Sequence, residues 1–433
     1  MLRFVLRCLL SLVGRTVAMT VFVVPSVSAA VTFDEALRQA AQHSQALPAQ
    51  QYSAEAARQR AVAANTLPDP VLRLAVENVP VDGPMRFSLD AERMTMRSIG
   101  LSQTFTDSSK REARLQRFQQ EVQLAEARWN TQLSTLQTET AKAWLSLYFQ
   151  RQLLSWQQQR REQVARQSEA MKVAFGSGRV SQQEWLAVRS QLLLLDEKLL
   201  AQQTQVSNAE IRLQRWIGTE QPLILAEMTP DFSRLPFDQQ HLRQAIDRYP
   251  EVATLLAQVE VSKAEAQIAK TETHSDWTWS VMYGVRDSEF GDMLSVGVSI
   301  PLQWNQSNRQ QREVTAKLSE ADQRRAETEE KRRLLLLDIQ QKWNSWQSLL
   351  ARQQQYQEQL LPLAEARTDS AQTAFASNKS SMAAVFDAER ALLDTRINHT
   401  SLQLQAALLW AELRFLFSVT AETAETFSIS SEP

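Results

Sequence analysis

The sequence predicts a mainly α-helical fold in which one helix–strand–strand–long helix–helix unit occurs twice. Three observations lead to this prediction. Glycine is rare, with nine in 433 residues, which is too few for an α/β enzyme with many tight turns. Leu, Ala and other apolar residues recur at helical spacing among Gln, Arg and Glu over most of the chain. Two short stretches, at 96–105 and 293–302, instead alternate between small and apolar residues, as β-strands do.

Residues 1–30 predict a signal peptide that is removed before the chain folds. Arg3 and Arg7 supply its positive start, an apolar stretch follows, and Ser28-Ala29-Ala30 offers a cleavage site. Cys8, the only cysteine, leaves with it, so we expect no disulfide, thiolate or lipid anchor. Because Arg15 leaves as well, the 47 basic and 49 acidic residues become a net charge of about −5. This charge argues against a nucleic-acid partner.

The rest of the chain is an internal duplication. The opening "TFDEALRQAAQHSQALPAQ" at 32–50 resembles "PFDQQHLRQAIDRYPEVAT" at 236–254. The turn "AFGSGRVS" at 174–181 resembles "AFASNKSS" at 374–381. The predicted boundaries are a first repeat at 31–220, a second repeat at 236–418 and a C-terminal tail at 419–433.

In each repeat the sequence predicts a helix with a proline in its first turn and a second, much longer helix. Pro48 and Pro250 suit the first turn of a helix. The long helix of the first repeat is expected at Ser108–Phe175, on the order of 100 Å, and must pack laterally against neighbours. Pro362 is expected to bend the second long helix shortly before its turn. After each turn, a 3/4 spacing of packing positions predicts coiled-coil helices: Val188, Leu192, Leu195, Leu199, Gln202, Val206, Ala209, Leu213 and Trp216, then Ala388, Leu392, Thr395, His399, Leu402, Ala406, Leu409, Leu413 and Leu416.

Four alternating segments predict two β-hairpins, at about 70–105 and 276–302. Each segment has about 9–11 residues, the length of a tilted strand that crosses a bilayer. A soluble sheet with one face on a core is the alternative, but no partner sheet is evident. Four strands cannot close a barrel, whereas three copies supply twelve, with the loops at 79–93 and 287–292 outside the cell. The segments are Val71–Asn78, Thr95–Phe105, Asp276–Arg286 and Asp292–Leu302.

With this order, the mature sequence resembles the TolC-like outer-membrane efflux family, including its FDEAL opening and proline-led second helix. Four stretches resemble its heavy-metal (CzcC/CusC-like) branch, which serves copper/silver or cobalt/zinc/cadmium pumps: "LPDPVLRLAVENVP" at 67–80, "MRSIGLSQTFTDSSKREAR" at 96–114, "LLPLAEAR" at 360–367 and "FDAERALLDTR" at 386–396.

The resemblance implies a homotrimer with a β-barrel in the lipid of a Gram-negative outer membrane and an α-helical tunnel in the periplasm. Its tip would dock a periplasmic adaptor (membrane fusion) protein and an inner-membrane RND pump, so the chain would be a passive conduit. A channel for multidrug efflux or type I secretion is the near alternative. A periplasmic coiled-coil scaffold without a pore is the distant one.

The resemblance also implies site residues at the tip. Gly176 and Gly178 permit the positive φ of a tight turn, and Asn378 is the best substitute for glycine in the second turn. Turn chemistry alone is the alternative explanation for these residues. The expected adaptor contacts are Gly176, Gly178, Arg179, Val180 and Ser181 in the first turn, and Asn378, Lys379 and Ser380 in the second.

A ring of acidic residues is the second site that the resemblance implies. Family members carry acids just after the second turn, pointing into the tunnel, and Asp387 keeps one such position. Ala384 replaces a second acid, so Glu184, its equivalent in the first repeat, is the other gate candidate. Three carboxylates around a narrow pore favour cations. The alternative is a solvated Asp387 that pairs with Arg390.

No enzyme, metal site or cofactor is expected. A nucleophile elbow, HExxH, P-loop and dinucleotide motif are all missing from the sequence. His43, His241, His274 and His399 have no partners at metal-ligand spacing. Met94 and Met96 are of the soft type that binds copper, but methionine at the end of a strand is more often a packing residue.

Overall fold

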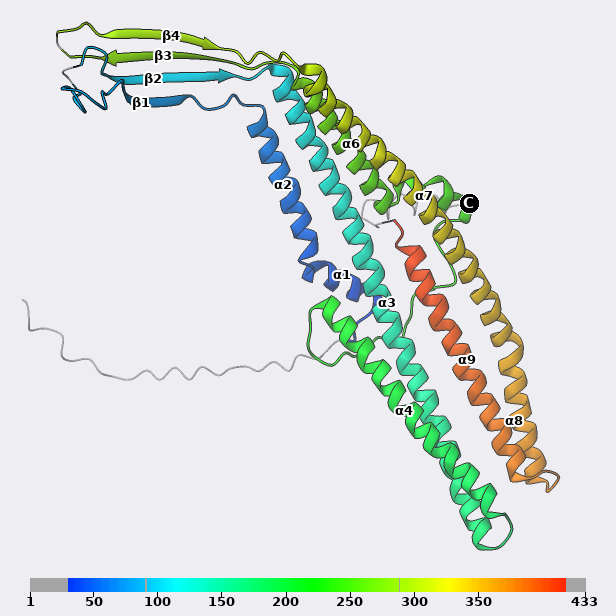
Figure 1. Ribbon diagram of the computed structural model, residues 1–433. Coiled ribbons are helices and arrows are strands. Elements are labelled where there is room, and N and C mark those ends of the chain that lie inside the picture. The colour runs from blue at the N-terminus through cyan, green and yellow to red at the C-terminus, as the bar shows by residue number, and fades with distance from the viewer. Residues whose placement is uncertain (1–29, 90–91, 288, 418–433) are drawn as a thin grey trace, which may run out of the picture.

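The computed structural model describes residues 30–89, 92–287 and 289–417. The expected signal peptide, apart from residue 30, and the expected tail at 419–433 lie outside the described residues. Two copies of one element order make up the chain, with the strands at one end of an elongated molecule and two helical hairpins at the other (Figure 1).

The elements confirm the predicted order. The first repeat contains α1 (Phe33–His43), α2 (Ala46–Ala64), β1 (Val71–Glu77), β2 (Met96–Phe105), α3 (Ser108–Gly176) and α4 (Gln182–Ile217). The second contains α5 (Gln239–Gln244), a 3₁₀ turn (Ile246–Arg248), α6 (Pro250–Thr271), β3 (Trp277–Val285), β4 (Met293–Ser299), a second 3₁₀ turn (Gln306–Asn308), α7 (Gln310–Gln355), a π-helical turn (Tyr356–Leu360), α8 (Leu361–Ala376) and α9 (Met382–Arg414).

Short polar side chains set where the main helices begin. The Asp107 carboxylate accepts the Ser109 backbone N–H at 2.8 Å and caps α3. Ser181 caps α4 by accepting the Glu184 N–H, and Ser381 caps α9 in the same way. Such caps satisfy backbone donors that have no partner within the helix. They explain why the 69-residue helix α3 begins at the predicted residue.

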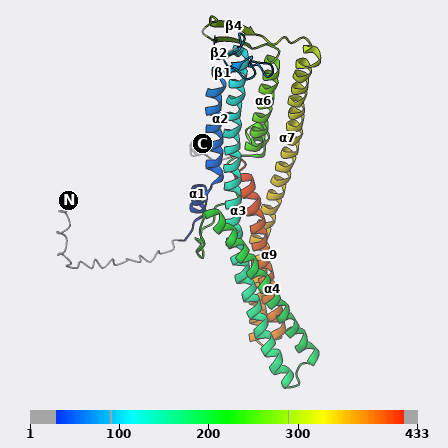
Figure 2. The same ribbon diagram turned by 60° about the vertical axis from the view of Figure 1, so that its left-hand side comes forward.

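Helix α3 is the axis along which the first repeat packs. Helix α2 lies beside its half near the strands and α4 beside its half near the hairpin tip (Figures 1 and 2). Helices α6 and α9 of the second repeat also pack against it. The predicted coiled-coil positions of α4 and α9 are all buried or half-buried. A helix of this length is therefore held by lateral contacts rather than by a core of its own.

The main core lies in the middle of the molecule, where the two repeats meet around tryptophan side chains. Trp144 is fully buried, and its ring meets Phe33 edge-on with centroids 5.7 Å apart. Its indole N–H donates to the Val31 carbonyl at 3.1 Å. Trp410 donates to the carbonyl of Arg234 at 2.8 Å. Both buried indoles thus have a hydrogen-bond acceptor for their N–H group, and these bonds attach the segments between helices to the helices.

The second long helix is interrupted at the predicted place. A π-helical turn at Tyr356–Leu360 separates α7 from α8, and Pro362 lies in the first turn of α8. Proline has no N–H, and its ring crowds the carbonyl four residues earlier. The chain accommodates it by a wider turn, in which the Leu361 N–H bonds to the Tyr356 carbonyl. Tyr356 stacks on His399 of α9, with centroids 6.0 Å apart.

The four strands form one antiparallel sheet in the order β1-β2-β3-β4. The central pair joins the two repeats, with Leu101 opposite Val281. β1 has seven residues where eight were predicted at 71–78, and β4 has seven where eleven were predicted at 292–302. β4 ends early because residues 300–302 pair with no residue of β3, and Pro301 has no N–H to donate.

Candidate functional site

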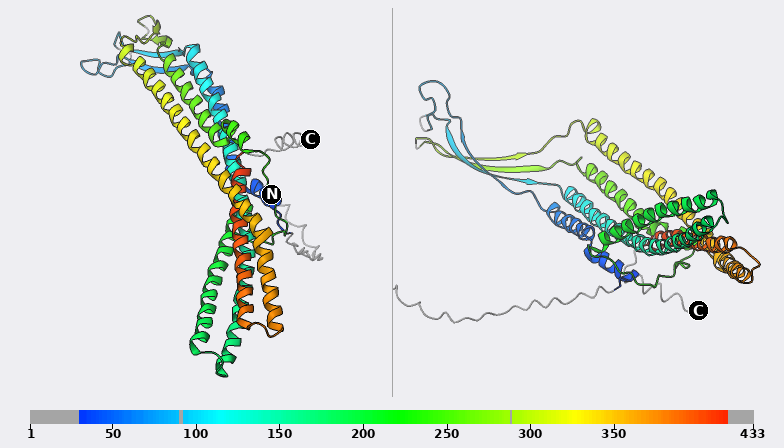
Figure 3. Two further views of the ribbon diagram at one scale, coloured as in Figure 1. Left: turned by 90° about the vertical axis from the view of Figure 1, so that its right-hand side faces the viewer. Right: turned by 90° about the horizontal axis from the view of Figure 1, so that it is seen from below.

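One face of the sheet is apolar and open to the surroundings. Leu74 and Val296 both expose 71% of their surface. In a water-soluble sheet one such face packs against a core, but here no described element covers it (Figure 3). By register, this face carries Leu72, Leu74, Val76, Ile99, Leu101, Phe105, Trp277, Trp279, Val281, Tyr283, Val285, Leu294, Val296 and Val298, and two polar residues, Arg97 and Gln103.

The opposite face is small and polar. Apart from Val71 and three methionines it carries Arg73, Ala75, Glu77, Ser98, Gly100, Ser102, Thr104, Thr278, Ser280, Gly284, Ser295, Gly297 and Ser299. Strands β1 and β4 are the two edges, and each pairs with a single neighbour among the described strands. A sheet with one apolar face, one polar face and two open edges fits part of a larger closed structure between lipid and water.

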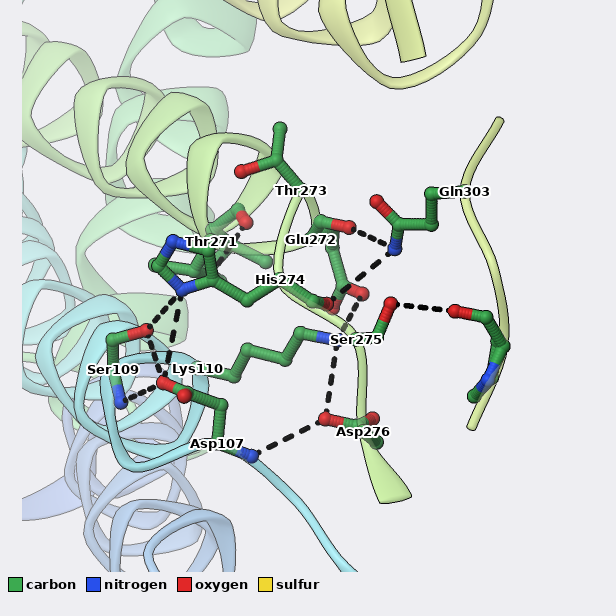
Figure 4. A network of polar contacts seen from close by, with 12 residues as sticks. Asp107, Ser109, Lys110, Thr271, Glu272, Thr273, His274, Ser275, Asp276 and Gln303 are labelled. Carbon is green, nitrogen blue, oxygen red and sulfur yellow. Dashed lines mark hydrogen bonds and ion pairs between the residues drawn. The ribbon is translucent and has the colours of Figure 1, made fainter. Parts of the chain in front are cut away.

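A buried lysine joins the sheet to the helices (Figure 4). The Lys110 side chain, in the first turn of α3, is only 4% exposed. Its Nζ lies 3.2 Å from a carboxylate oxygen of Glu272 and 3.2 Å from one of Asp276. Asp276 also accepts the backbone N–H of Asp107 at 3.2 Å. The start of the first long helix is thereby fixed to the segment between α6 and β3.

Further polar contacts extend this junction to β4. The Gln303 amide donates to the Glu272 carbonyl at 3.1 Å, and the Ser275 hydroxyl donates to the Pro301 carbonyl at 2.7 Å. His274 Nδ1 lies 3.2 Å from the Ser109 hydroxyl oxygen. The junction therefore sets the orientation of the sheet relative to the helices in both repeats (Figure 4).

The two hairpin tips have the same geometry. The N–H groups of Gly178 and Asn378 donate to the carbonyls of Phe175 and Phe375, each at 2.9 Å. Gly178 has φ +73° and Asn378 has φ +58°, so the predicted left-handed positions are confirmed. Gly176 is different from the prediction, because it is the last residue of α3 and does not adopt a positive φ. A left-handed residue two positions later completes the reversal.

The other tip residues form the ends of the hairpins. Arg179 and Lys379 are exposed, and their N–H groups bond back to Ala174 and Ala374. Val180 and Ser380 are half-buried next to them, and Ser181 is the exposed cap of α4. All the predicted tip residues lie at one end of the molecule (Figure 1).

The two predicted gate carboxylates both have partners on their own hairpin. Glu184 accepts the Ser181 N–H at 2.7 Å, and this bond together with the Ser181 hydroxyl lowers the pKa of its carboxyl. Asp387 is exposed and forms an ion pair with Arg390 at 3.0 Å. In the single chain each carboxylate thus has a partner within its own hairpin.

Three contacts between α3 and α9 near the tips are absent from the predicted site. Arg160 forms an ion pair with Asp394 at 2.8 Å. Gln163, 2% exposed, donates to the Phe386 carbonyl at 2.9 Å. The Trp156 indole N–H donates to the Thr400 hydroxyl at 3.2 Å. The spacing of 156, 160 and 163 on one helix face was a signal, but the partners lie more than 220 residues away.

Among the described residues, no cluster of three or more His, Cys, Asp or Glu side chains could hold a metal ion. His399 is half-buried beside Tyr356, and burial lowers its pKa. Within the same residues, no helix combines the length and the apolar character needed to cross a membrane.

Comparison with known proteins gives a family match and several structural matches. Residues 36–219 match the family model of outer membrane efflux proteins. The fold is similar to that of the outer-membrane channel OprN, at 14% identity over 89% of each chain, with a TM-score of 0.71. It is similar to CusC at 15% identity, over 90% of this chain and 93% of that one, with a TM-score of 0.73.

A third structural match is the outer membrane protein VceC from Vibrio cholerae, at 16% identity. It covers 89% of this chain and 96% of VceC, with a TM-score of 0.69. No curated protein matches the sequence. The family model matches the first repeat, and the structural matches show that both repeats together have the fold of these proteins.

Proposed function

We propose that this chain is the outer-membrane channel of a tripartite efflux system. Three copies would join β4 of one chain to β1 of the next and close a twelve-stranded barrel. The apolar face of the sheet would contact lipid and the polar face would line the pore. The observation that carries the proposal is the sheet itself, because its open edges and uncovered apolar face are satisfied only in a closed membrane barrel.

The helices would continue the barrel as a tunnel through the periplasm, closed at the hairpin tips. We propose that the α3–α9 contacts around Arg160 and Gln163 hold the two hairpins of each chain together in the closed state. Asp387 from three copies would form a cation-favouring ring, with Glu184 nearby. A periplasmic adaptor would dock on Gly176, Gly178, Arg179, Val180, Ser181, Asn378, Lys379 and Ser380 and open the tip toward an inner-membrane RND pump.

Single-channel recordings in planar lipid bilayers test the channel and its closure. The purified protein is expected to conduct weakly, and Arg160→Ala is expected to conduct more because one contact between the hairpins is lost. Arg58→Ala is the matched control, since it removes an ion pair of 3.0 Å to Glu126 between α2 and α3, away from the tip. Equal conductance in the two variants would contradict the closure, and no conductance with no detergent-resistant trimer would refute the channel in favour of a scaffold.

The proposed cargo is a heavy-metal cation, copper/silver or cobalt/zinc/cadmium, as the sequence motifs at 67–80 and 96–114 suggest. Growth of a deletion strain, with and without the restored gene, on these metals and on a drug panel tests the cargo. Sensitivity restricted to metals is expected. Sensitivity to drugs with normal growth on metals would instead indicate a multidrug channel of the same fold.

A further inference from the structure

Three methionines lie near one another by register on the polar face of the sheet, beside Gly284 and Gly100. Gly284 of β3 is paired with Met293 of β4, and Met282 precedes it by two residues on the same face. The Sδ of Met96, from β2, lies 2.8 Å from the position that a Cβ on Gly284 would occupy. The Met96 side chain therefore lies over Gly284, which is buried, as are Ser98 and Gly100 beside it.

The thioether of Met96 leaves room only for glycine at position 284 while it keeps its present place. A Cβ at 2.8 Å from sulfur would force Met96 to move. Gly100 is less crowded, since Met282 Cβ and Cγ lie 3.5 Å from its Cβ position, an ordinary van der Waals contact. Met96 and Met293 begin β2 and β4 at the end of the sheet farthest from the helices, and Met282 lies farther along β3 (Figure 1).

Apolar packing does not explain why methionine is on this face. The apolar face is the opposite one, and Met293 remains 47% exposed. The other residues around Gly284 are Ser98, Ser295 and Gly100, which bury no large side chain. The sheet and its hairpin loops cover less than one sixth of the chain, yet they hold five of the eight described methionines: Met85, Met94, Met96, Met282 and Met293, against Met171, Met228 and Met382.

We propose that Met96, Met282 and Met293 form a binding site for a soft monovalent cation, Cu(I) or Ag(I). Thioether sulfur is neutral and polarisable, so it prefers soft cations to Zn(II) or other harder ions. It carries no ionisable proton in the physiological range, so the affinity is nearly independent of pH. A few thioethers bind weakly enough to release the ion, which suits a site at the exit of a conduit. The placement of this site at the exit of a pore rests on the proposed channel function.

Silver titration of the full-length protein in detergent tests the site. The probe is Ag(I) nitrate in chloride-free buffer, followed by NMR of ¹³C-labelled methionine methyl groups. The methyl signals of Met96, Met282 and Met293 are expected to shift together, and Zn(II) is expected to shift none of them. Met228, which is 85% exposed and lies far from the sheet, provides the reference signal.

Leucine substitutions separate ligation from packing, because leucine has nearly the volume of methionine but no sulfur. Each of Met96→Leu, Met282→Leu and Met293→Leu is expected to weaken silver binding roughly tenfold or more. Met228→Leu is the matched control and should leave the affinity unchanged. Gly284→Ala should also weaken binding, by displacing the Met96 sulfur.

Two outcomes would overturn the site: unchanged affinity in the triple leucine variant, or equal silver shifts at all described methionines. Both are independent of the channel, whose test is conductance. A protein that conducts but binds no silver at these methionines refutes this site alone. A protein that binds silver there but neither conducts nor forms a detergent-resistant trimer refutes the channel and keeps the site.

Discussion

The buried ion pairs of Lys110 make the clearest prediction about how the sheet is held to the helices. Lys110→Met keeps most of the side-chain length and removes the ammonium group, so Glu272 and Asp276 each lose a partner at 3.2 Å. A hydrogen bond to a charged group contributes about 1.5–3 kcal/mol, and breaking a fully buried pair costs about 3–5 kcal/mol.

We expect the Lys110→Met substitution to cost less than the roughly 3–5 kcal/mol of a fully buried pair. The side chains of Glu272 and Asp276 remain 44% and 29% exposed, so water can solvate both carboxylates. Glu272 also keeps its ion pair with Arg114 at 3.1 Å, and Asp276 keeps the Asp107 N–H. Methionine is itself cheaper to bury than lysine. We therefore expect a loss of about 2–3 kcal/mol in the local free energy of opening at the junction.

Native-state hydrogen exchange in detergent measures this quantity. A loss of 2–3 kcal/mol corresponds to a protection factor about 30- to 150-fold lower, at the amides of residues 107–112 and 272–278. Lys331→Met is the matched control: it removes an ion pair to Glu251 at 3.4 Å whose lysine is 48% exposed, and such pairs contribute about 0–1 kcal/mol. Equal losses in the two variants, or unchanged protection in Lys110→Met, would refute the reasoning.

Two further predictions concern the tip and the centre of the molecule. Gly178→Ala should lower the free energy of unfolding of the tip by about 1–2 kcal/mol, because the φ of Gly178 is +73°. Gly176→Ala, within the helix, should not lower it. Equal hydrogen-exchange rates at the tip in both variants would contradict this. Burial alone raises the pKa of Glu412, but hydrogen bonds and charges from Lys142 and Lys342 outweigh it, so the net pKa is lowered. Its contribution is therefore complete above the ordinary value of 4.5 and lost as the pH falls through the lowered pKa. Glu412→Gln should lower the thermal midpoint at neutral pH and flatten its fall below pH 4.5, and an unchanged pH profile would contradict the sign.

Much of the fold is predictable because its signals are local. The period of 2 in residues 96–105 and 293–302 and the 3/4 spacing after each turn come from the way side chains alternate on strands and helices. Asp107 and Ser181 are cap residues that set where helices begin, and Pro362 interrupts the helix where it must. Asn378 reproduces the left-handed glycine of the first turn.

The tip prediction was less complete, since it rested on the turns and on acidic residues near them. It identified Asp387 and Glu184, whose observed partners are on their own hairpin. It missed Arg160 and Gln163, whose partners are on a helix of the other repeat. Their shared helix face is a weak signal, because Gln and Arg are common along α3.

Sequence periodicity by itself determined the element order, the helix bounds and the two faces of the sheet, because each depends on neighbours within a few turns or one strand. The tertiary structure alone decided that β2 pairs with β3, that Lys110 reaches Asp276 and that Met96 lies over Gly284. Those contacts join segments more than 160 residues apart. They depend on how the long helices pack laterally and bring the two hairpins into one sheet, and no local pattern records that arrangement.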